Sequence, residues 1–388
     1  MRTVSRRSFL CTASAVALAA AACPGFAAKH ARSTPHVAPG APKRKRVYVA
    51  SLTDDGLLAY HWDPIAAELI PAGVAAKVPK VAWIAATASA EFLFTASELD
   101  NFQGKPTGEV ASFRQLHGEL TPVSAVNAAG IGTCHVGLDR TGRVLVAADY
   151  VGGSAASYRV KGGALSEIVW QEHYMEHGTN PRQASAHAHF VSFSPDNRYV
   201  YINDLGGDQI HIYKLNTATA NLTSAGSYRA AAGSGPRTLH FHTNNRTAYS
   251  VNEITSTVDV LDFSRADGSL TLLKRIELLP EGSNGPTRGC DTVITRDGRF
   301  VYFANRDNNF LYTFKADPRT GELTAVKRSN CGGKTPRHFT LDPTERWMLV
   351  ANQDSNLISV FARNPETGEL AEEPKNFAAQ APMRILFT

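Results

Sequence analysis

Seven copies of one strand pattern predict an all-β chain that folds as a seven-bladed β-propeller. Each copy has a strand rich in β-branched or aromatic residues, a short polar turn, a second alternating strand and a polar stretch that ends in Leu. The closing leucines are spaced 45 to 57 residues apart, which is the length of one four-stranded blade. The copies span residues 46–69, 92–120, 144–165, 199–222, 247–270, 300–323 and 347–370.

The hydrophobic period within the copies indicates strands. Segments such as HIYKL, TVDVLDF and LISVF alternate apolar and polar residues, whereas the period of a helix is absent from them. A further strand precedes most copies, and each of these strands ends in a tight polar turn. These preceding strands read HVGLD, HFVSFS, RTLHFH, CDTVIT and RHFTLD.

The two ends of the repeat region predict a closed ring. The first copy, which begins with RVYVAS at 46–51, has no preceding strand. The C-terminal PMRILFT at 382–388 has the pattern of that missing strand. Pairing of the two would leave no open sheet edge.

The N-terminus is typical of an exported protein. Residues 1–28 contain Arg6 and Arg7 in a positively charged start, then an Ala-rich apolar stretch, and so resemble a twin-arginine signal peptide. Residues 29–46 are expected to form a disordered basic linker and residues 47–388 the propeller. We expect a periplasmic protein, with a lipid anchor through Cys23 as the alternative. No later run of apolar residues is long enough to span a membrane.

The charge of the folded part gives no case for nucleic-acid binding. Nine of the 40 basic residues precede residue 47 and no acidic residue does, which leaves 31 basic against 35 acidic residues in 47–388. A folded part with this slightly negative net charge lacks the positively charged surface that nucleic-acid binding requires.

We expect the protein to be a monomer.

Cysteine and histidine spacing indicates no zinc motif. Cys134, Cys290 and Cys331 follow the signal region; the pair 290–331 could be bridged, and three unpaired thiols are the alternative. His173-Tyr174-Met175-Glu176-His177 matches the HxxEH pattern, but that pattern needs a helix. Here an exposed loop is expected, and no metal or cofactor is predicted.

The order of strands predicts where a site lies. In each blade the preceding, innermost strand is antiparallel to the next one, so the start of the first and the end of the second meet at one mouth of the channel. Basic side chains that point to this mouth favour an anionic small-molecule ligand. The alternative is that they line a water-filled channel and have no ligand. The polar residues at these positions are His135, His187, His189, Arg237, Arg337, Arg384, Asp149, Asp204, Glu253, Arg306 and Gln353.

These segments also carry a family resemblance. GSGPRTLHFH (233–242), VNEITSTVDV (251–260) and TPRHFTLDP (335–343) resemble the seven-bladed lactonase family, which includes propeller-type 6-phosphogluconolactonases and carboxy-cis,cis-muconate cyclase. The resemblance implies a lactonase, a carboxylic ester hydrolase. The catalytic residues that it implies are His189, Glu253, Arg237 and Arg306. The supporting residues that it implies are His187, Asp204, Asn305, Arg337 and Gln353.

Two positions depart from the family pattern. Asp149 stands where family members commonly have Asn, and Thr238 stands where they commonly have His. Both lie near the expected mouth, and export is unusual for an enzyme of 6-phosphogluconolactone, a cytoplasmic metabolite. The substrate is therefore left open within the class of anionic lactones.

The mechanism predicted for such a site is hydrolysis by an activated water molecule. His189 or Glu253 would be the general base, and Arg237 and Arg306 would hold the anion and stabilise the oxyanion. Two arginines should depress the pKa of Glu253 and weaken it as a base, which favours His189. A structural ion pair between Glu253 and Arg237 is the alternative for that residue. A lactone-forming, muconate-type cycloisomerase and a non-catalytic binding propeller are the alternative functions.

Overall fold

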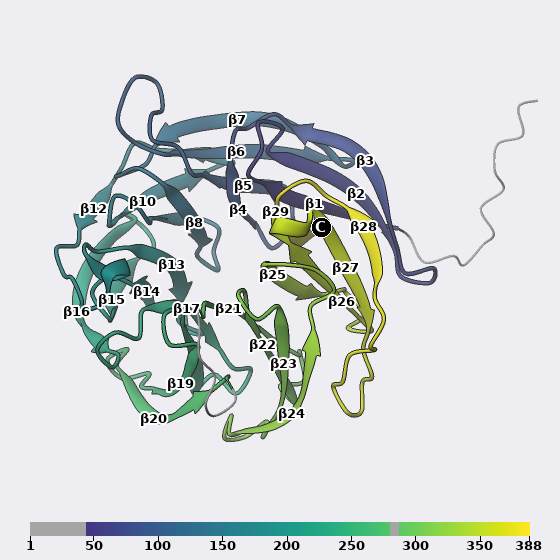
Figure 1. Cartoon of the computed structure of the whole chain (residues 1–388). Coiled ribbons are helices and arrows are strands. Elements are labelled where there is room, and N and C mark those ends of the chain that lie inside the picture. Colours follow the sequence, from purple (N-terminus) through teal and green to yellow (C-terminus); the bar gives the residue numbers. More distant parts are fainter. Residues whose placement is uncertain (1–43, 280–286) are drawn as a thin grey trace, which may run out of the picture. The chain divides into compact units, whose positions relative to one another are not determined.

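The computed structural model describes residues 44–279 and 287–388, which form seven antiparallel sheets arranged around a central axis (Figure 1). Blade 1 consists of β29 (Pro382–Phe387), β1 (Lys45–Ser51), β2 (Leu57–Asp63) and β3 (Glu68–Ala76). Blade 2 consists of β4 (Val81–Ala86), β5 (Phe92–Ser97), β6 (Glu109–Leu116) and β7 (Glu119–Asn127). Blade 3 consists of β8 (Thr133–Leu138), β9 (Val144–Asp149), β10 (Ser154–Lys161), β11 (Ala164–Leu165) and β12 (Trp170–His173).

Blades 4 to 7 repeat the same four-stranded order. Blade 4 consists of β13 (Ala188–Phe193), β14 (Tyr199–Asp204), β15 (Gln209–Asn216) and β16 (Asn221–Arg229). Blade 5 consists of β17 (Pro236–Phe241), β18 (Thr247–Asn252), β19 (Thr257–Phe263) and β20 (Leu270–Glu277). Blade 6 consists of β21 (Gly289–Ile294), β22 (Phe300–Asn305), β23 (Phe310–Ala316) and β24 (Leu323–Asn330). Blade 7 consists of β25 (Pro336–Leu341), β26 (Trp347–Asn352), β27 (Leu357–Ala362) and β28 (Lys375–Ala378).

The described residues contain only two short 3-10 helices, η1 (Pro181–Gln183) and η2 (Gln353–Ser355). The predicted fold class is therefore confirmed. The five preceding strands expected from the sequence correspond to β8, β13, β17, β21 and β25, and the structure adds β4 to them. None of the described helices is long and apolar enough to cross a membrane.

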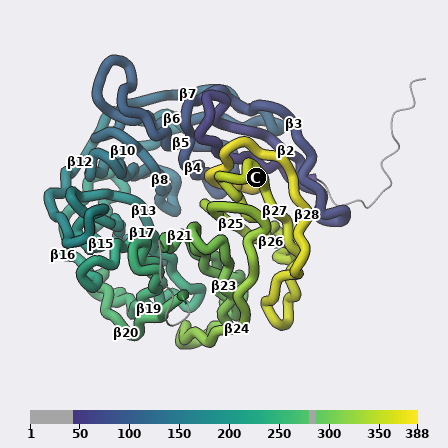
Figure 2. The backbone as a smooth tube through the Cα atoms, in the orientation of Figure 1, coloured from purple at the N-terminus to yellow at the C-terminus, as the bar shows by residue number. Residues whose placement is uncertain are grey.

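The C-terminal strand closes the ring as predicted. β29 pairs antiparallel with β1, with Val49 opposite Ile385, so the first and last strands of the described chain lie side by side in blade 1 (Figures 1 and 2). One boundary was wrong: Lys45 and Arg46, expected in the linker, begin β1 and pair with Trp62 and His61 of β2. Their backbone groups extend the ladder beyond the apolar part of the strand. The predicted signal peptide lies outside the described residues, as does the linker up to residue 43.

Seven apolar cores hold the blades together, one between each pair of neighbours. The core between blades 4 and 5, for example, packs Tyr201 and Ile212 against Leu239 and Phe263. The remaining cores join blades 1 and 2, 2 and 3, 3 and 4, 5 and 6, 6 and 7, and 7 and 1. Each sheet therefore buries both faces against its neighbours, which a single blade cannot do alone.

A tyrosine on the second strand of several blades locks the next blade in place. Tyr201 donates a hydrogen bond to the Gly268 carbonyl at 2.7 Å and Tyr249 donates one to the Gly321 carbonyl at 2.6 Å. Gly268 has a φ of +81°, a region that disfavours other residues. Each glycine lies in the turn before the outermost strand of the next blade, so the repeat pattern includes a blade-to-blade hydrogen bond.

The innermost strands share one irregularity at their starts. Each skips a residue in its register with the second strand, as between Ala188 and Phe190 or between Pro236 and Thr238. Such β-bulges re-aim a side chain and often lie beside active sites. The skipped residues are Met383, Ala82, Cys134, His189, Arg237, Cys290 with Asp291, and Arg337.

Candidate active site

In several blades, the residue directly after the second strand lies at the mouth of the central channel. The last residues of the second strands are fully buried Ser, Asp or Asn side chains, whereas the next residue faces the mouth in several blades. Glu253 follows β18 and Arg306 follows β22 in this way. Bulged inner-strand residues and these strand-end residues therefore converge from different blades on one place.

Glu253 is the centre of the polar cluster at the mouth. Its Oε2 lies 2.9 Å from Nε of Arg237 and 2.5 Å from Nη2 of Arg306. Its Oε1 accepts a hydrogen bond from Arg182, a residue of η1. The side chain of Glu253 is only 3% exposed. Three arginines from three parts of the chain thus surround one buried carboxylate.

His189 lies beside this ion-pair cluster. Its Nε2 is 3.8 Å from Oε2 of Glu253, and its ring packs edge-on against Tyr150 with 5.3 Å between centroids. The side chain is 8% exposed, and its Nδ1 has no hydrogen-bond partner among the described residues. His189 therefore lines the cavity with an imidazole whose buried Nδ1 forms no hydrogen bond with the described residues.

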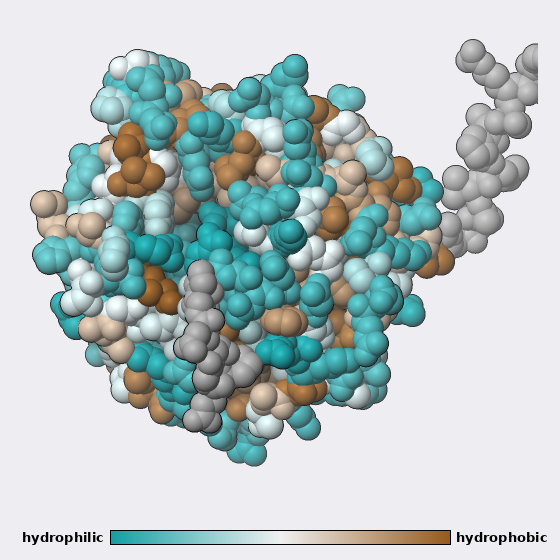
Figure 3. Space-filling view, in the orientation of Figure 1, coloured by the Kyte–Doolittle hydropathy of each residue, from teal (hydrophilic) through white to brown (hydrophobic). Residues whose placement is uncertain are grey.

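The cluster forms one wall of a cavity of about 290 Å³. This volume is close to the lower end for small-molecule sites, about 300–1,000 Å³. Hydrophilic residues gather around the centre of the ring on the face shown in Figure 3. The cavity is lined by Glu98, Asp100, Gly132, Cys134, Tyr150, Val151, Arg182, His189, Glu253, Arg288, Arg306 and Arg337.

Burial and charge act against each other on the ionisable groups. Burial alone would raise the pKa of Glu253, but Arg306, Arg237 and their neighbours hold this pKa well below its usual range. Burial, then the charge of Arg237, lower the pKa of His189 well below its usual value. Burial lowers the pKa of Arg306 to about 10. At neutral pH the site therefore contains an ionised Glu253, a neutral His189 and charged arginines.

Two cavity arginines have unused hydrogen-bonding capacity. Among the described residues, the ion-pair contact of Arg337 is a long one, 3.9 Å to Glu98, and Nε of Arg306 has no hydrogen-bond partner. Arg288, by contrast, is held by Asp307 at 2.6 Å. Arg237 donates to the Cys290 carbonyl at 2.5 Å and lines a smaller void deeper on the axis, not the main cavity.

The structure brings together some of the site residues predicted from the sequence and separates others. His189, Glu253, Arg306 and Arg337 line the cavity, and Arg237 lies directly behind Glu253. His187, Asp204, Asn305 and Gln353 do not line it. His187 stacks on Tyr150 at 4.5 Å between centroids, so it supports a cavity wall instead of facing the cavity.

Asp204 and Asn305 fix the backbone beside the mouth. Asp204 accepts hydrogen bonds from the backbone of His187 at 2.7 Å and Gly206 at 3.0 Å. Asn305 donates to Ser256 at 2.7 Å and accepts from the backbone of Asp307 at 3.0 Å. Both are last residues of their strands, so their side chains point into the turn.

Three other residues predicted at the mouth have different surroundings. Asp149 accepts hydrogen bonds from Thr133 at 2.6 Å and Ser154 at 2.7 Å, and burial raises its pKa to about 7. His135 packs on Trp83, and Arg384 lies over the same Trp83 ring at 4.4 Å. His135 and Arg384 therefore belong to the packed interior of the channel, whereas Asp149 holds the backbone at the end of its strand, where it accepts from the Gly130 N–H.

A second buried carboxylate lies in that interior. Asp291 is 2.9 Å from Nε2 of His240 and 3.9 Å from Nε2 of His338, which contacts Arg384. Only about 10 Å³ of space remains nearby, about one water molecule. The predicted basic character of the channel mouth was therefore only partly right, because the carboxylates of Glu253 and Asp291 neutralise much of its positive charge.

Several cavity residues were missed by sequence reasoning. Glu98 follows β5 at the position that Glu253 takes after β18, so the repeat alignment could have identified it. Arg288 directly precedes β21 and could have been found in the same way. Arg182 lies in the connection between β12 and β13, where Asn180 caps η1. The sequence around Asn180 indicates the cap, but it does not indicate that the side chain of Arg182 points into the cavity.

The cysteines and the HxxEH segment are settled by the described residues. Cys134, Cys290 and Cys331 are all free and buried, so the bridge 290–331 does not form. His173 ends β12 and the rest of the motif follows without a helix. The pattern expected of the zinc-protease motif is therefore absent.

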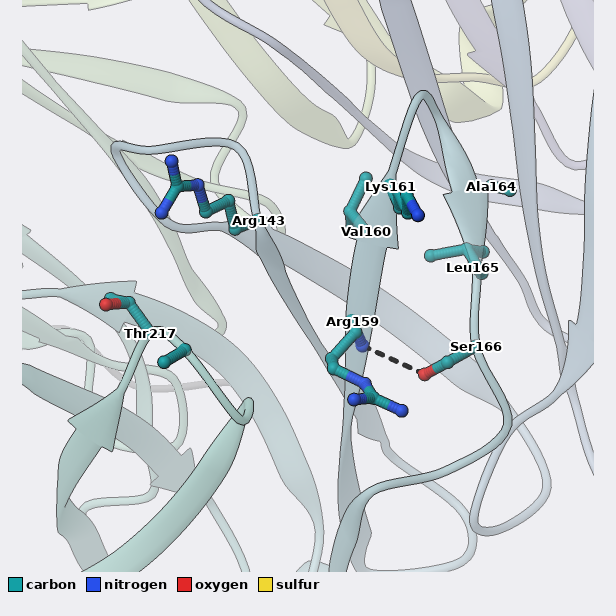
Figure 4. Close-up of a pocket in the computed structure, with 9 residues that line it drawn as sticks. Arg143, Arg159, Val160, Lys161, Ala164, Leu165, Ser166 and Thr217 are labelled. Atoms are coloured by element: carbon teal, nitrogen blue, oxygen red, sulfur yellow. Dashed lines mark hydrogen bonds between the residues drawn. The ribbon is translucent and has the colours of Figure 1, made fainter.

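A larger hollow lies away from the axis. It measures about 720 Å³ and is lined by turns and outer strands of blades 3 and 4. Arg143 comes from a turn, Arg159 and Lys161 come from β10, and the backbone N–H of Arg159 donates to Ser166 (Figure 4). All three basic residues are exposed, and neither a carboxylate nor an imidazole lines the hollow. It lacks the convergent groups of a catalytic site.

Comparison with known proteins agrees with this geometry. The family model described as "Lactonase, 7-bladed beta-propeller" matches residues 31–387. The chain belongs to this lactonase family. The 6-phosphogluconolactonase of Bacillus subtilis is 29% identical over 308 residues, covering 78% of this chain and 86% of that protein.

Two solved structures superpose closely on this chain. A periplasmic gluconolactonase from Pseudomonas aeruginosa has a TM-score of 0.84 at 30% identity, covering 89% of this chain and 99% of that one. A protein from Lactobacillus plantarum has a TM-score of 0.83 at 25% identity, covering 89% and 100%. The lactonase-family resemblance and the enzyme class predicted from the sequence are thereby confirmed.

Proposed function

We propose that this lactonase hydrolyses an anionic sugar lactone in the cavity at the channel mouth, with His189 as the general base. The observation that carries the proposal is the neutral His189 beside an arginine-bound Glu253 in a cavity of about 290 Å³. The similarity to a 6-phosphogluconolactonase and to a gluconolactonase supports a sugar lactone as substrate.

Arg306 and Arg337 are the groups best able to bind the anion. Both line the cavity, and both keep donors that the described residues do not use fully. A guanidinium offers two parallel donors that match a phosphate or carboxylate. One of the two can hold the fixed charge of the substrate while the other stabilises the oxyanion that forms at the carbonyl.

His189 is better suited than Glu253 to activate water. Both oxygens of Glu253 lie in ion pairs with arginines, and these charges lower its pKa and therefore its basicity. His189 is neutral at neutral pH, because burial and Arg237 lower its pKa, and it lines the cavity. In the reaction, His189 takes a proton from water and the water oxygen attacks the lactone carbonyl. The ring C–O bond then breaks as the protonated His189 returns the proton to the ring oxygen.

Glu253 then serves as a positioning residue. Its Oε2 holds Nη2 of Arg306 at 2.5 Å and Nε of Arg237 at 2.9 Å. Removing a counter-charge from a buried cluster leaves the remaining charges uncompensated. The carboxylate therefore keeps the arginines in place without touching the reacting carbonyl.

Export to the periplasm and a monomeric state are parts of the proposal. The twin-arginine-like start of the sequence supports export, and the similar Pseudomonas aeruginosa protein is itself described as periplasmic. Expression of the full chain with and without Arg6→Lys and Arg7→Lys, followed by fractionation, tests this part. Retention of the double variant in the cytoplasm is expected.

The activity is tested by pH-stat hydrolysis of 6-phosphogluconolactone and of the neutral glucono-δ-lactone, each corrected for its spontaneous rate. We expect acceleration of both, with a preference for the phosphorylated lactone that Arg337→Ala removes. Leu116→Ala, an exposed change far from the mouth, is the control. A protein that accelerates neither lactone would contradict the proposal and favour a lactone-forming or purely binding role.

A further inference from the structure

Glu176, Asp204 and His211 form a second cluster of metal-binding residue types outside the cavity lining. The three offer carboxylate and imidazole donor atoms that all lie within 4.8 Å of one another. Nε2 of His211 is 3.8 Å from Oδ2 of Asp204. The cluster joins the connection after β12 to the ends of β14 and β15 in blade 4.

Two donor atoms of the cluster are buried and unused. Oδ2 of Asp204 and Nε2 of His211 have no hydrogen-bond partner among the described residues, and the side chain of Asp204 is 0% exposed. Oδ1 of the same carboxylate is satisfied by two backbone donors. A buried, unpartnered carboxylate oxygen costs free energy unless something binds it.

The surroundings hold the cluster in shape and leave room at its centre. The ring of Tyr174 stacks on His211 with 4.1 Å between centroids, which fixes the imidazole plane. A Cβ at Gly207 would lie 2.5 Å from Oδ2 of Asp204 and 2.7 Å from Cβ of Glu176. Glycine therefore keeps open the space between the two carboxylates.

We propose that Glu176, Asp204 and His211 bind one zinc ion. Zinc accepts imidazole and carboxylate ligands together, whereas calcium and magnesium prefer oxygen ligands alone. Metal–ligand bonds of about 2.0–2.2 Å at a tetrahedral angle place donors about 3.4 Å apart. The 3.8 Å between His211 and Asp204 is near this value, and the partly exposed Glu176 can move the remaining distance.

The ion would tie the β12–β13 connection to blade 4. Glu176 belongs to the same connection as Arg182, and Arg182 binds Glu253 at the mouth. Zinc would thus restrain the segment that delivers one arginine to the active site. No metal was predicted from the sequence, because the HxxEH pattern at residues 173–177 needs a helix and an exposed loop was expected there. The proposed cluster takes only Glu176 from that segment.

Equilibrium dialysis of the full chain against zinc, with metal content measured by mass spectrometry, tests the site. The probe variants are Glu176→Gln and His211→Asn, and the matched control is the double variant His173→Asn and His177→Asn. We expect each probe variant to bind one zinc ion fewer than the wild type, while the control loses none from this site. Glu176→Gln changes a partly exposed side chain, so its fold should be retained, and circular dichroism checks this.

Two further measurements distinguish zinc bound by Glu176, Asp204 and His211 from zinc bound unspecifically by surface histidines. Zinc should raise the Tm of the wild type but not that of Glu176→Gln. It should also slow hydrogen exchange of residues 174–187 in the wild type alone. Equal zinc stoichiometry in wild type and both probe variants, or a loss that follows His173 and His177, would overturn the proposal. None of these measurements depends on lactone hydrolysis.

Discussion

All seven inner strands have a β-bulge near their start, but the type of residue at the bulge differs between two regions of the ring. In blades 1 to 3 the bulged residue is Met383, Ala82 or Cys134. In blades 4, 5 and 7 it is His189, Arg237 or Arg337, and in blade 6 the irregularity covers Cys290 and the charged Asp291. The first region closes the channel by packing, whereas the second provides charge and an imidazole at the same backbone position. The backbone bulge thus sets the direction of the side chain. The residue type then decides whether that side chain packs inside the channel or takes part in the site.

The largest effect should separate His189 from Cys134, its counterpart in the apolar region. Loss of a general base costs about 10²–10⁴-fold in rate, so we expect His189→Gln to lower kcat by that order. Cys134→Ala should change kcat by only a few-fold, because the thiol is a buried group whose pKa burial raises far above neutral. Steady-state kinetics on the same lactone measures both. Equal losses in the two variants would erase the proposed division of the ring.

Glu253 should affect stability as well as activity. Glu253→Gln leaves Arg237 and Arg306 buried without their counter-charge, which costs roughly 3–5 kcal/mol for a broken buried pair. Urea unfolding should show this as a lower midpoint with an unchanged m-value. Glu98→Gln, at the equivalent strand end of blade 2 but more exposed, is the comparison. A stable Glu253→Gln protein with normal KM would show that the carboxylate does not organise the site.

Asn305 should contribute to the fold and not to substrate binding. Asn305→Ala removes hydrogen bonds to Ser256 and to the backbone of Asp307, and buried polar groups left unsatisfied cost about 1–3 kcal/mol. We expect a lower Tm with little change in KM. Gln353→Ala, one residue beyond the matching strand end in blade 7, should change neither quantity. A rise in KM at unchanged Tm would return Asn305 to the substrate-binding group.

The pH profile should be displaced toward acid. Burial and Arg237 lower the pKa of His189 below its usual value, and the base works only when neutral. Activity is therefore present above the lowered pKa and is lost as the pH falls through it. We expect kcat/KM for hydrolysis to stay nearly constant from neutral pH to below 6.5 and to fall only in more acidic solution. A midpoint at or above 6.5 would exclude His189, in this environment, as the base.

The fold was predictable because its signals are periodic, while the site depends on single-residue register. Seven strand copies and the C-terminal PMRILFT were enough to indicate the blades and the closure. The strand ends were harder to assign: Asn305 is the last residue of β22 and points into the turn, whereas Arg306, one position later, lines the cavity. Asp204 is likewise the last residue of its strand and points into the turn. Because successive side chains of a strand alternate in direction, that single step decides between a turn-binding and a cavity-lining role. Arg182 reaches the site from a non-repeating connection, where no pattern indicates direction.

The central claim, that the charged region of the mouth binds an anionic sugar acid or lactone, is tested most directly by calorimetric titration with 6-phosphogluconate. This product analogue separates binding from turnover. We predict one binding site in the wild type, weakened about 10-fold or more in Arg337→Ala because a charge-assisted hydrogen bond contributes about 1.5–3 kcal/mol. Gluconate, which lacks the phosphate, should bind wild type and Arg337→Ala more nearly alike. Absence of binding, or equal binding of 6-phosphogluconate by both proteins, would contradict the account.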